Sequence, residues 1–223
     1  MGRVLDLLLP QRCLVCAVPG RQVCDVCSAG LRRIKPPLCE RCGAATAWPV
    51  SRCAECAGRR LAFACARAAV EYDEPVRRIV AAWKERGLRR LAGWAGGLVA
   101  GTVERPDVHC LAYVPGDADR RLQRGHHAAE RFAEALGEAW ALPVRSLLVR
   151  TRGSRRQRGL PRSERRRNVA GAFRPTEHAP PQVCLVDDVY TTGATVNAAA
   201  STLRKGGARR VEVVTFARAI RVR

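Results

Sequence analysis

Two adjacent carboxylates and a run of threonines around a glycine stand out in the segment VCLVDDVYTTGATVN, residues 183–197. A short apolar run leads into Asp187 and Asp188, and hydroxyl side chains follow them. This pattern predicts a buried strand that ends at the acidic pair, then a tight turn, then a helix. Because the first N–H groups of a helix carry the positive end of its dipole, the segment predicts an anion-binding site.

The same residues favour a phosphorylated sugar as the anion. Gly193 would let the backbone approach a phosphate closely, and the hydroxyls of Thr191, Thr192 and Thr195 would donate to it or cap the helix. The two carboxylates would repel a phosphate unless they faced sugar hydroxyls or a bridging Mg²⁺. Phosphoribosyl pyrophosphate (PRPP) has all three features. The alternative is an ordinary strand and capped helix whose carboxylates only face solvent.

Eight of the 11 cysteines form four C-x-x-C pairs within the first 60 residues. Zinc binds four thiolates in a tetrahedron, so these pairs predict two structural zinc sites without an open coordination position. Pairing neighbouring motifs keeps the loops short, but interleaved pairing also agrees with the sequence. A redox dithiol is the alternative, and it would normally be a single pair beside a βαβ unit. The predicted ligands are Cys13, Cys16, Cys24, Cys27, Cys39, Cys42, Cys53 and Cys56.

The composition indicates the partners and the compartment that we expect. The 223 residues include 40 basic and 20 acidic side chains, and the net charge of +20 predicts polyanionic partners. The alternative is that arginine is spread over solvated faces. Residues 1–9 are too short and too charged for a signal peptide or a membrane span, so we expect a cytoplasmic protein without a membrane partner. Thiols stay reduced in that compartment, which favours zinc over disulfides.

Strand-like and helix-like patterns alternate after residue 60. This alternation predicts an α/β fold with a mostly parallel sheet flanked by helices, preceded by a small zinc-ribbon domain. We expect the domains to span residues 1–60 and 61–223, because the cysteine pairs cease at that point. The expected strands are 63–72, 110–114, 183–186 and 211–216. The expected helices are 75–86, 88–103, 125–140 and one that ends at Gly206 and Gly207.

The apolar strand, the acidic pair and the T-T-G-A-T loop resemble the PRPP motif of type I phosphoribosyltransferases. This resemblance implies that Asp187 and Asp188 hold the ribose hydroxyls and take part in catalysis. It also implies that the 5′-phosphate is bound by Thr191, Thr192, Gly193, Ala194 and Thr195. With the four cysteine pairs, nearly the whole chain is similar to the ComF/GntX-like competence-associated proteins. Further matching segments are 5–9, 79–84, 114–115, 124–125 and 150–152.

The chain departs from this family at two places. After Arg124 and Gly125 the family usually continues with an aromatic residue, an amide and a glutamine, whereas this chain has His126, His127 and Ala128. Thr191 stands where purine-salvage relatives usually have an acidic residue that serves the purine ring. The second departure disfavours a hypoxanthine-type enzyme.

If the site is active, a nucleophile attacks the anomeric carbon of PRPP while Mg-bound pyrophosphate leaves through a cationic transition state. The sequence indicates neither the general base nor the acceptor. Cations near the pocket would stabilise the leaving group, and residues 150–167 contain nine arginines. This segment could close over PRPP, bind a nucleic-acid backbone, or simply be solvated. The candidate PRPP-binding cations are Arg121, Arg124, Arg150 and Arg152.

Two functions therefore stay open. The first is a phosphoribosyltransferase that binds PRPP with Mg²⁺ and acts on an unknown acceptor. The second is an accessory factor for DNA uptake or single-stranded DNA, which the competence association implies, with a regulatory or vestigial PRPP site. Aromatic residues make up only 5% of the chain, and stacking on single strands needs exposed rings, which favours the first function.

Overall fold

The computed structural model of the chain describes residues 11–85, 88, 90–116, 128–151 and 171–220. A five-stranded sheet forms its centre, with the strand order β1-β7-β6-β2-β3 and parallel pairing throughout. The predicted mostly parallel sheet is thus confirmed. Its strands are β1 (Cys65–Glu71), β7 (Arg210–Arg218), β6 (Gln182–Tyr190), β2 (Cys110–Tyr113) and β3 (Val144–Arg145). A separate antiparallel pair is formed by β4 (Leu148–Arg150) and β5 (Phe173–Pro175).

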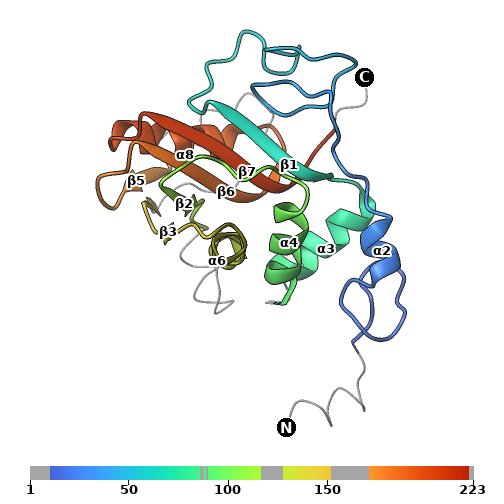
Figure 1. The fold of residues 1–223 in the computed structure, drawn as a ribbon. Helices are drawn as coiled ribbons and strands as arrows, with labels where there is room; N and C mark the ends of the chain where they lie inside the picture. Colours follow the sequence, from blue (N-terminus) through green and yellow to red (C-terminus); the bar gives the residue numbers. More distant parts are fainter. Residues whose placement is uncertain (1–10, 86–87, 89, 117–127, 152–170, 221–223) are drawn as a thin grey trace.

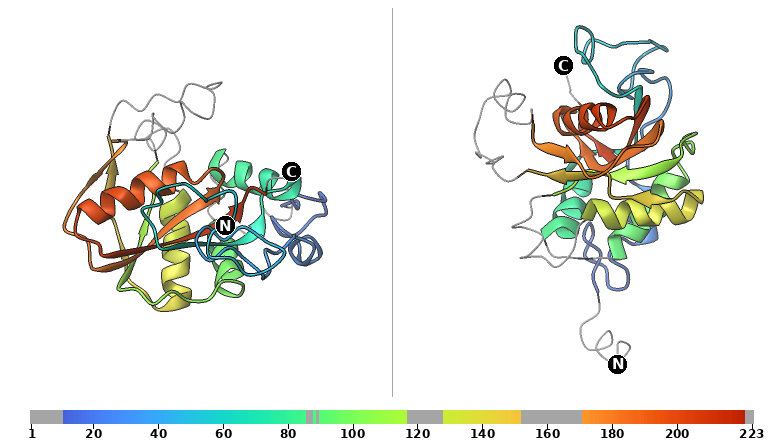
Figure 2. Two further views of the ribbon diagram at one scale, coloured as in Figure 1. Left: turned by 90° about the horizontal axis from the view of Figure 1, so that it is seen from above. Right: turned by 90° about the vertical axis from the view of Figure 1, so that its left-hand side faces the viewer.

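Helices cover both faces of the sheet, as Figures 1 and 2 show. On one face, Trp83, Leu91 and Phe132 share an apolar cluster that joins three helices to the sheet. On the other face a second cluster contains Val196 and Leu203. The helices of the first face are α3 (Glu74–Glu85), α4 (Arg90–Ala100) and α6 (Ala128–Trp140), and that of the second face is α8 (Ala194–Lys205). Within the described ranges, every helix is too short or too polar to cross a bilayer.

The cysteine-rich segment contributes to both of these clusters. Val23 and Leu31, which flank the short helix α2 (Asp25–Ala29), pack with α3, α4 and α6. Cys39 and Cys56 pack with α8 instead. The two halves of the segment therefore lie on opposite faces of the sheet, below and above it in Figure 1. The domain boundary between residues 60 and 61 stays a prediction.

The expected elements occur with shifted ends. β1, β2 and α4 are slightly shorter than predicted, α3 has the predicted length but begins one residue earlier, and β6 and β7 are longer. The prediction that the strand ends at the acidic pair was wrong. β6 continues to Tyr190 because Asp187 stays paired with Thr215 of β7, and Val189 with Ala217. Residues 125–127 of the predicted third helix lie outside the described residues.

Candidate functional site

The acidic pair and the threonine-glycine loop (residues 191–195) lie where the order of strands reverses. From β6 the chain passes through α8 to β7, and from β2 through α6 to β3 on the other side of β6. Ligands of open α/β sheets bind at such a reversal, outside the carboxyl ends of the strands. Asp187 and Asp188 stand near the carboxyl end of β6, and the loop follows directly. The topology therefore places both predicted features at the expected position for a ligand.

Asp188 is nearly buried and forms an ion pair. It is 6% exposed, and its Oδ2 lies 2.6 Å from Nζ of Lys84 in the last turn of α3. Burial acts to lower the pKa of Lys84, but the charges of Asp188 and Asp187 raise it. Lys84 stays protonated and compensates part of the negative charge. The sequence analysis did not identify it as a site residue, although it is one of only three lysines in the chain.

Asp187 is the carboxylate whose charge changes near neutral pH. Its Oδ1 accepts a hydrogen bond from the backbone N–H of Asp188 at 2.9 Å. Burial and then the charge of Asp188 raise the pKa of Asp187 to about 7, against the opposing charges of Lys84 and Arg150. Ionisation of Asp187 is thus opposed mainly by burial and also by the charge of Asp188. A ligand that brings hydroxyl donors or a cation would favour the ionised form.

The loop after β6 turns tightly at Gly193. This residue is the N-cap of α8 and has a positive φ of 71°, which favours glycine. A Cβ at this position would overlap the phenol ring of Tyr190, so the ring also requires a glycine. The backbone N–H of Ala194 donates to Oγ1 of Thr192 at 3.3 Å, but the N-cap is Gly193 and makes no side-chain capping bond, so the predicted capping by a threonine stays a prediction. The close approach of a phosphate to Gly193 stays a prediction.

Of the four candidate arginines, the structure describes Arg150. It ends β4, and its guanidinium carbon lies 5.4 Å from the centre of the Phe173 ring. Its charge acts on Asp187, so it lies within electrostatic reach of the acidic pair. The assignment of these residues to PRPP stays a prediction. Outside the described ranges lie Arg121, Arg124, Arg152, His126 and His127.

The eight paired cysteines form two groups in the predicted ligand positions. The first cysteine group is Cys13, Cys16, Cys24 and Cys27, and the second is Cys39, Cys42, Cys53 and Cys56. The motifs therefore pair in sequence order, and within each group the sulfur atoms lie within 4.8 Å of one another. The distances between Sγ atoms include 3.7 Å for Cys16 and Cys24, and 3.6 Å for Cys39 and Cys56. Sulfurs around a tetrahedral zinc are about 3.8 Å apart, so both groups fit zinc.

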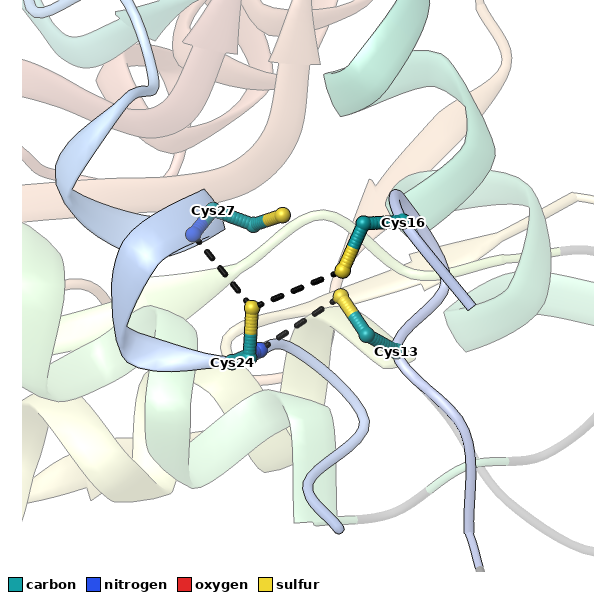
Figure 3. A group of neighbouring side chains, drawn as sticks. All are labelled: Cys13, Cys16, Cys24 and Cys27. Carbon is teal, nitrogen blue, oxygen red and sulfur yellow. Dashed lines mark hydrogen bonds between the residues drawn. The ribbon is translucent and has the colours of Figure 1, made fainter. Parts of the chain in front are cut away.

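Backbone N–H groups point at sulfur atoms in both groups. The N–H of Cys24 donates to Sγ of Cys13 at 3.5 Å (Figure 3), and that of Cys53 donates to Sγ of Cys39 at 3.3 Å. Burial acts to raise the pKa of Cys13, but backbone N–H groups lower it to about 6. The pKa of Cys39 is lowered in the same way to about 7. Each group thus contains a thiol that ionises readily, as metal binding requires.

The second half of the cysteine-rich segment also contacts the candidate site. Arg59 Nη2 donates to the carbonyl oxygen of Thr192 at 2.8 Å. The backbone N–H of Ala62 donates to Oδ1 of Asn197, in the first turn of α8, at 2.7 Å. These bonds join residues 59 and 62 to the loop and to the first turn of α8. Nothing in the sequence marks these pairs, because their members lie far apart along the chain.

Comparison with known proteins identifies the relatives of this chain. Residues 4–69 match the family model described as "Double zinc ribbon domain". Competence protein F of Haemophilus influenzae is 28% identical over 207 residues, which cover 87% of this chain and 90% of that protein. The DNA utilization protein YhgH of Salmonella typhimurium is 27% identical over 234 residues, which cover 96% of this chain and 100% of that protein. The chain is similar to these competence and DNA utilization proteins over most of its length.

The predicted resemblance to the competence-associated family and the predicted double zinc ribbon are both confirmed. Among solved structures, a glutamine PRPP amidotransferase from B. subtilis, complexed with ADP and GMP, has a TM-score of 0.40 at 20% identity. That likeness covers 56% of this chain and 26% of the amidotransferase chain.

Proposed function

We propose that this protein binds PRPP with Mg²⁺ and transfers its phosphoribosyl group to an acceptor. The observation that carries the proposal is the position of the acidic pair and the threonine-glycine loop. Both lie at the strand-order reversal, immediately before the N-terminus of α8. A helix N-terminus favours the phosphate of the ligand, and the carboxylates favour its hydroxyls. No single one of these features would favour PRPP over other anions, but their combination supports this choice.

Each part of the site has a role in this proposal. The backbone of residues 191–195 binds the 5′-phosphate, and Asp187 and Asp188 accept hydrogen bonds from the ribose hydroxyls. The same carboxylates stabilise the positive charge that develops on the ribose as the bond to pyrophosphate breaks. Lys84 holds Asp188 in place through their 2.6 Å ion pair. Arg150 lies within electrostatic reach and supplies positive charge for the diphosphate.

Carboxylate oxygens such as those of Asp187 are the ligand type that Mg²⁺ prefers, and Mg²⁺ bound to the diphosphate would neutralise the leaving group. Asp187 fits this role because burial and the charge of Asp188 raise its pKa to about 7, and a nearby cation would stabilise its ionised form. Asp188 is only 6% exposed, and such a poorly hydrated surrounding strengthens its electrostatic contacts.

Binding measurements on isosteric variants test the proposal. We expect the double variant Asp187→Asn/Asp188→Asn to lose at least about tenfold in affinity for PRPP with Mg²⁺, equivalent to about 1.4 kcal/mol. Glu134→Gln is the matched control, because Glu134 pairs with Arg131 on the surface of α6, away from the loop. Equal PRPP affinity in the double variant and the wild type would place the binding site elsewhere.

A second candidate function is an accessory role on single-stranded DNA. The observation that favours it is Trp48, which is 69% exposed in the ribbon and belongs to a segment that also carries the exposed Arg52. Stacking of a base on an aromatic ring contributes roughly 1 to 3 kcal/mol and does not depend on sequence. The names of the relatives agree with such a partner. In this case the PRPP site would regulate the protein or be a remnant.

A further inference from the structure

Arg218, the last residue of β7, is a buried cation whose partners are Cys42 of the second cysteine group and Glu55, which lies between two other members of that group. It is 1% exposed. Its Nη1 donates to the carbonyl oxygen of Cys42 at 2.6 Å, and its Nη2 donates to Oε2 of Glu55 at 2.9 Å. Nη2 also lies 3.6 Å from Sγ of Cys42. Because a buried guanidinium is stable only when its charge is compensated, the position of Arg218 depends on this group.

The same guanidinium packs against the end of β6. Its central carbon lies 4.5 Å from the centre of the Tyr190 ring, and Tyr190 is 3% exposed. This ring fills the space that a Cβ of Gly193 would need. A continuous line of contacts therefore runs from Cys42 through Arg218 and Tyr190 to Gly193, the N-cap of α8.

The second cysteine group and the loop are also joined by hydrogen bonds. Arg59 follows Cys56 by three residues and bonds to the carbonyl oxygen of Thr192. Ala62 bonds to the side chain of Asn197. The contacts through Arg218 and Tyr190 reach Gly193 from β7. The bonds of Arg59 and Ala62 instead reach Thr192 and Asn197 from the segment that follows Cys56. A metal ion in the second group would thus restrain the loop both through Arg218 and through the bonds of Arg59 and Ala62.

The first cysteine group provides the contrast. It lies on the opposite face of the sheet, where Val23 and Leu31 pack with α3, α4 and α6. A tetrahedral metal in either group would fix the local backbone to the same extent. Among the described residues, the contacts that lead to α8 and the loop start from the second group and its neighbours Glu55, Arg59 and Ala62.

We propose that Arg218 is a positioning residue that couples the second cysteine group to residues 190–193. Metal in this group fixes Cys42 and Glu55, these fix the guanidinium, and the guanidinium holds Tyr190 against Gly193. The loop then keeps its conformation before any ligand arrives. The importance of that conformation for PRPP depends on the proposed function, but the coupling itself does not.

Hydrogen exchange of the zinc-loaded full chain without PRPP tests the coupling. We measure two peptides, residues 189–198 at the loop and residues 128–140 in α6, in the wild type and four variants. Arg218→Met removes the guanidinium, and Arg218→Lys keeps the charge but loses the planar fork that binds two acceptors and stacks on a ring. Cys42→Ser opens the second group and Cys16→Ser opens the first.

We expect exchange in residues 189–198 to accelerate about tenfold in Arg218→Met and in Cys42→Ser, a factor that corresponds to about 1.4 kcal/mol. Arg218→Lys should give a smaller acceleration. Exchange in residues 128–140 should stay unchanged in both Arg218 variants, and Cys16→Ser should leave residues 189–198 as in the wild type. A chelator should also remove one of the two zinc ions faster from Arg218→Met, whereas Arg21→Met, beside the first group, should not alter zinc release.

Two results would overturn the coupling. One is unchanged exchange at residues 189–198 in Arg218→Met and Cys42→Ser. The other is equal acceleration of both peptides in all three variants at Arg218 and Cys42, because Arg218 would then support the whole fold rather than the loop. Failure of PRPP to bind the wild type would refute the proposed function and leave the exchange result unaffected, so the two failures are distinguishable.

Discussion

Replacing Asp187 by asparagine should stabilise the unliganded protein, although the same change is expected to weaken PRPP binding. Burial and the charge of Asp188 raise the pKa of Asp187 from 3.8 to about 7. The folded chain therefore keeps a proton that the unfolded chain releases, and stability falls as the pH rises between these two values. Asparagine carries no charge, and its Oδ1 can still accept the hydrogen bond from the N–H of Asp188. The substitution therefore removes only the free-energy cost of ionising a buried carboxylate beside Asp188.

The size of the effect follows from the shift in pKa. One pKa unit corresponds to about 1.4 kcal/mol, so a shift of about three units gives an upper limit of about 4 kcal/mol above pH 7. The gain from Asp187→Asn is smaller at lower pH, because the wild type is then protonated in the folded state. Between about pH 5 and about pH 8 the gain should grow by roughly 2 to 3 kcal/mol.

Urea unfolding of zinc-loaded protein, followed by the fluorescence of the buried Trp83 and Trp140, measures this gain. Glu134→Gln is the control, since it removes a carboxylate from an exposed ion pair and should change stability by less than about 1 kcal/mol at either pH. A gain for Asp187→Asn that is absent at pH 8, or equal at pH 5 and pH 8, would refute the electrostatic reasoning.

Three further predictions follow from the same structure. Metal analysis of the purified protein should find about two zinc ions per chain, because two groups of four sulfurs fit zinc. A folded, zinc-free preparation with intact thiols would contradict this prediction. Lys84→Met should lower the free energy of unfolding by about 2 kcal/mol in urea titrations. Loss of a fully buried pair would cost roughly 3 to 5 kcal/mol, and the smaller value is expected because the Lys84 side chain is 36% exposed. An unchanged unfolding midpoint would show that Asp188 does not need this partner. Binding to single-stranded DNA should weaken with salt with a log–log slope of at least about two, at about 0.7 per phosphate contact. Changing Arg155, Arg156 and Arg158 to alanine should flatten that slope, and binding that does not respond to salt would exclude this partner.

The sequence predicts local features best. The paired cysteines form the two predicted groups, and the threonine-glycine loop leads into α8, whereas the acidic pair lies inside β6 rather than at its end. The extent of β6 could not be predicted, because charged residues normally end a buried strand. Here pairing with β7 continues past Asp188, whose charge is balanced by Lys84.

Other parts of the site depend on contacts between distant segments. Lys84 and Asp188 belong to different elements, and so do Arg59 and Thr192. Arg218 resembles every other arginine in a chain that is rich in arginine, and only its burial beside Cys42 distinguishes it. The strands β3, β4 and β5 contain two or three residues, too few for any periodicity to appear.

The two cysteine groups illustrate how similar motifs acquire different roles from their position. Both fit the same metal with the same geometry, yet one supports the helical face and the other supports the loop. Exchange of the metal at the second group would therefore affect ligand binding, whereas exchange at the first would affect mainly the packing of α3, α4 and α6.

Titration calorimetry of PRPP into the zinc-loaded wild type, with and without Mg²⁺, tests the central claim most directly. The account predicts saturable binding of about one PRPP per chain that requires Mg²⁺ and is lost in Asp187→Asn/Asp188→Asn. Absence of any binding heat for the folded, zinc-loaded wild type at about millimolar PRPP and Mg²⁺ would contradict it.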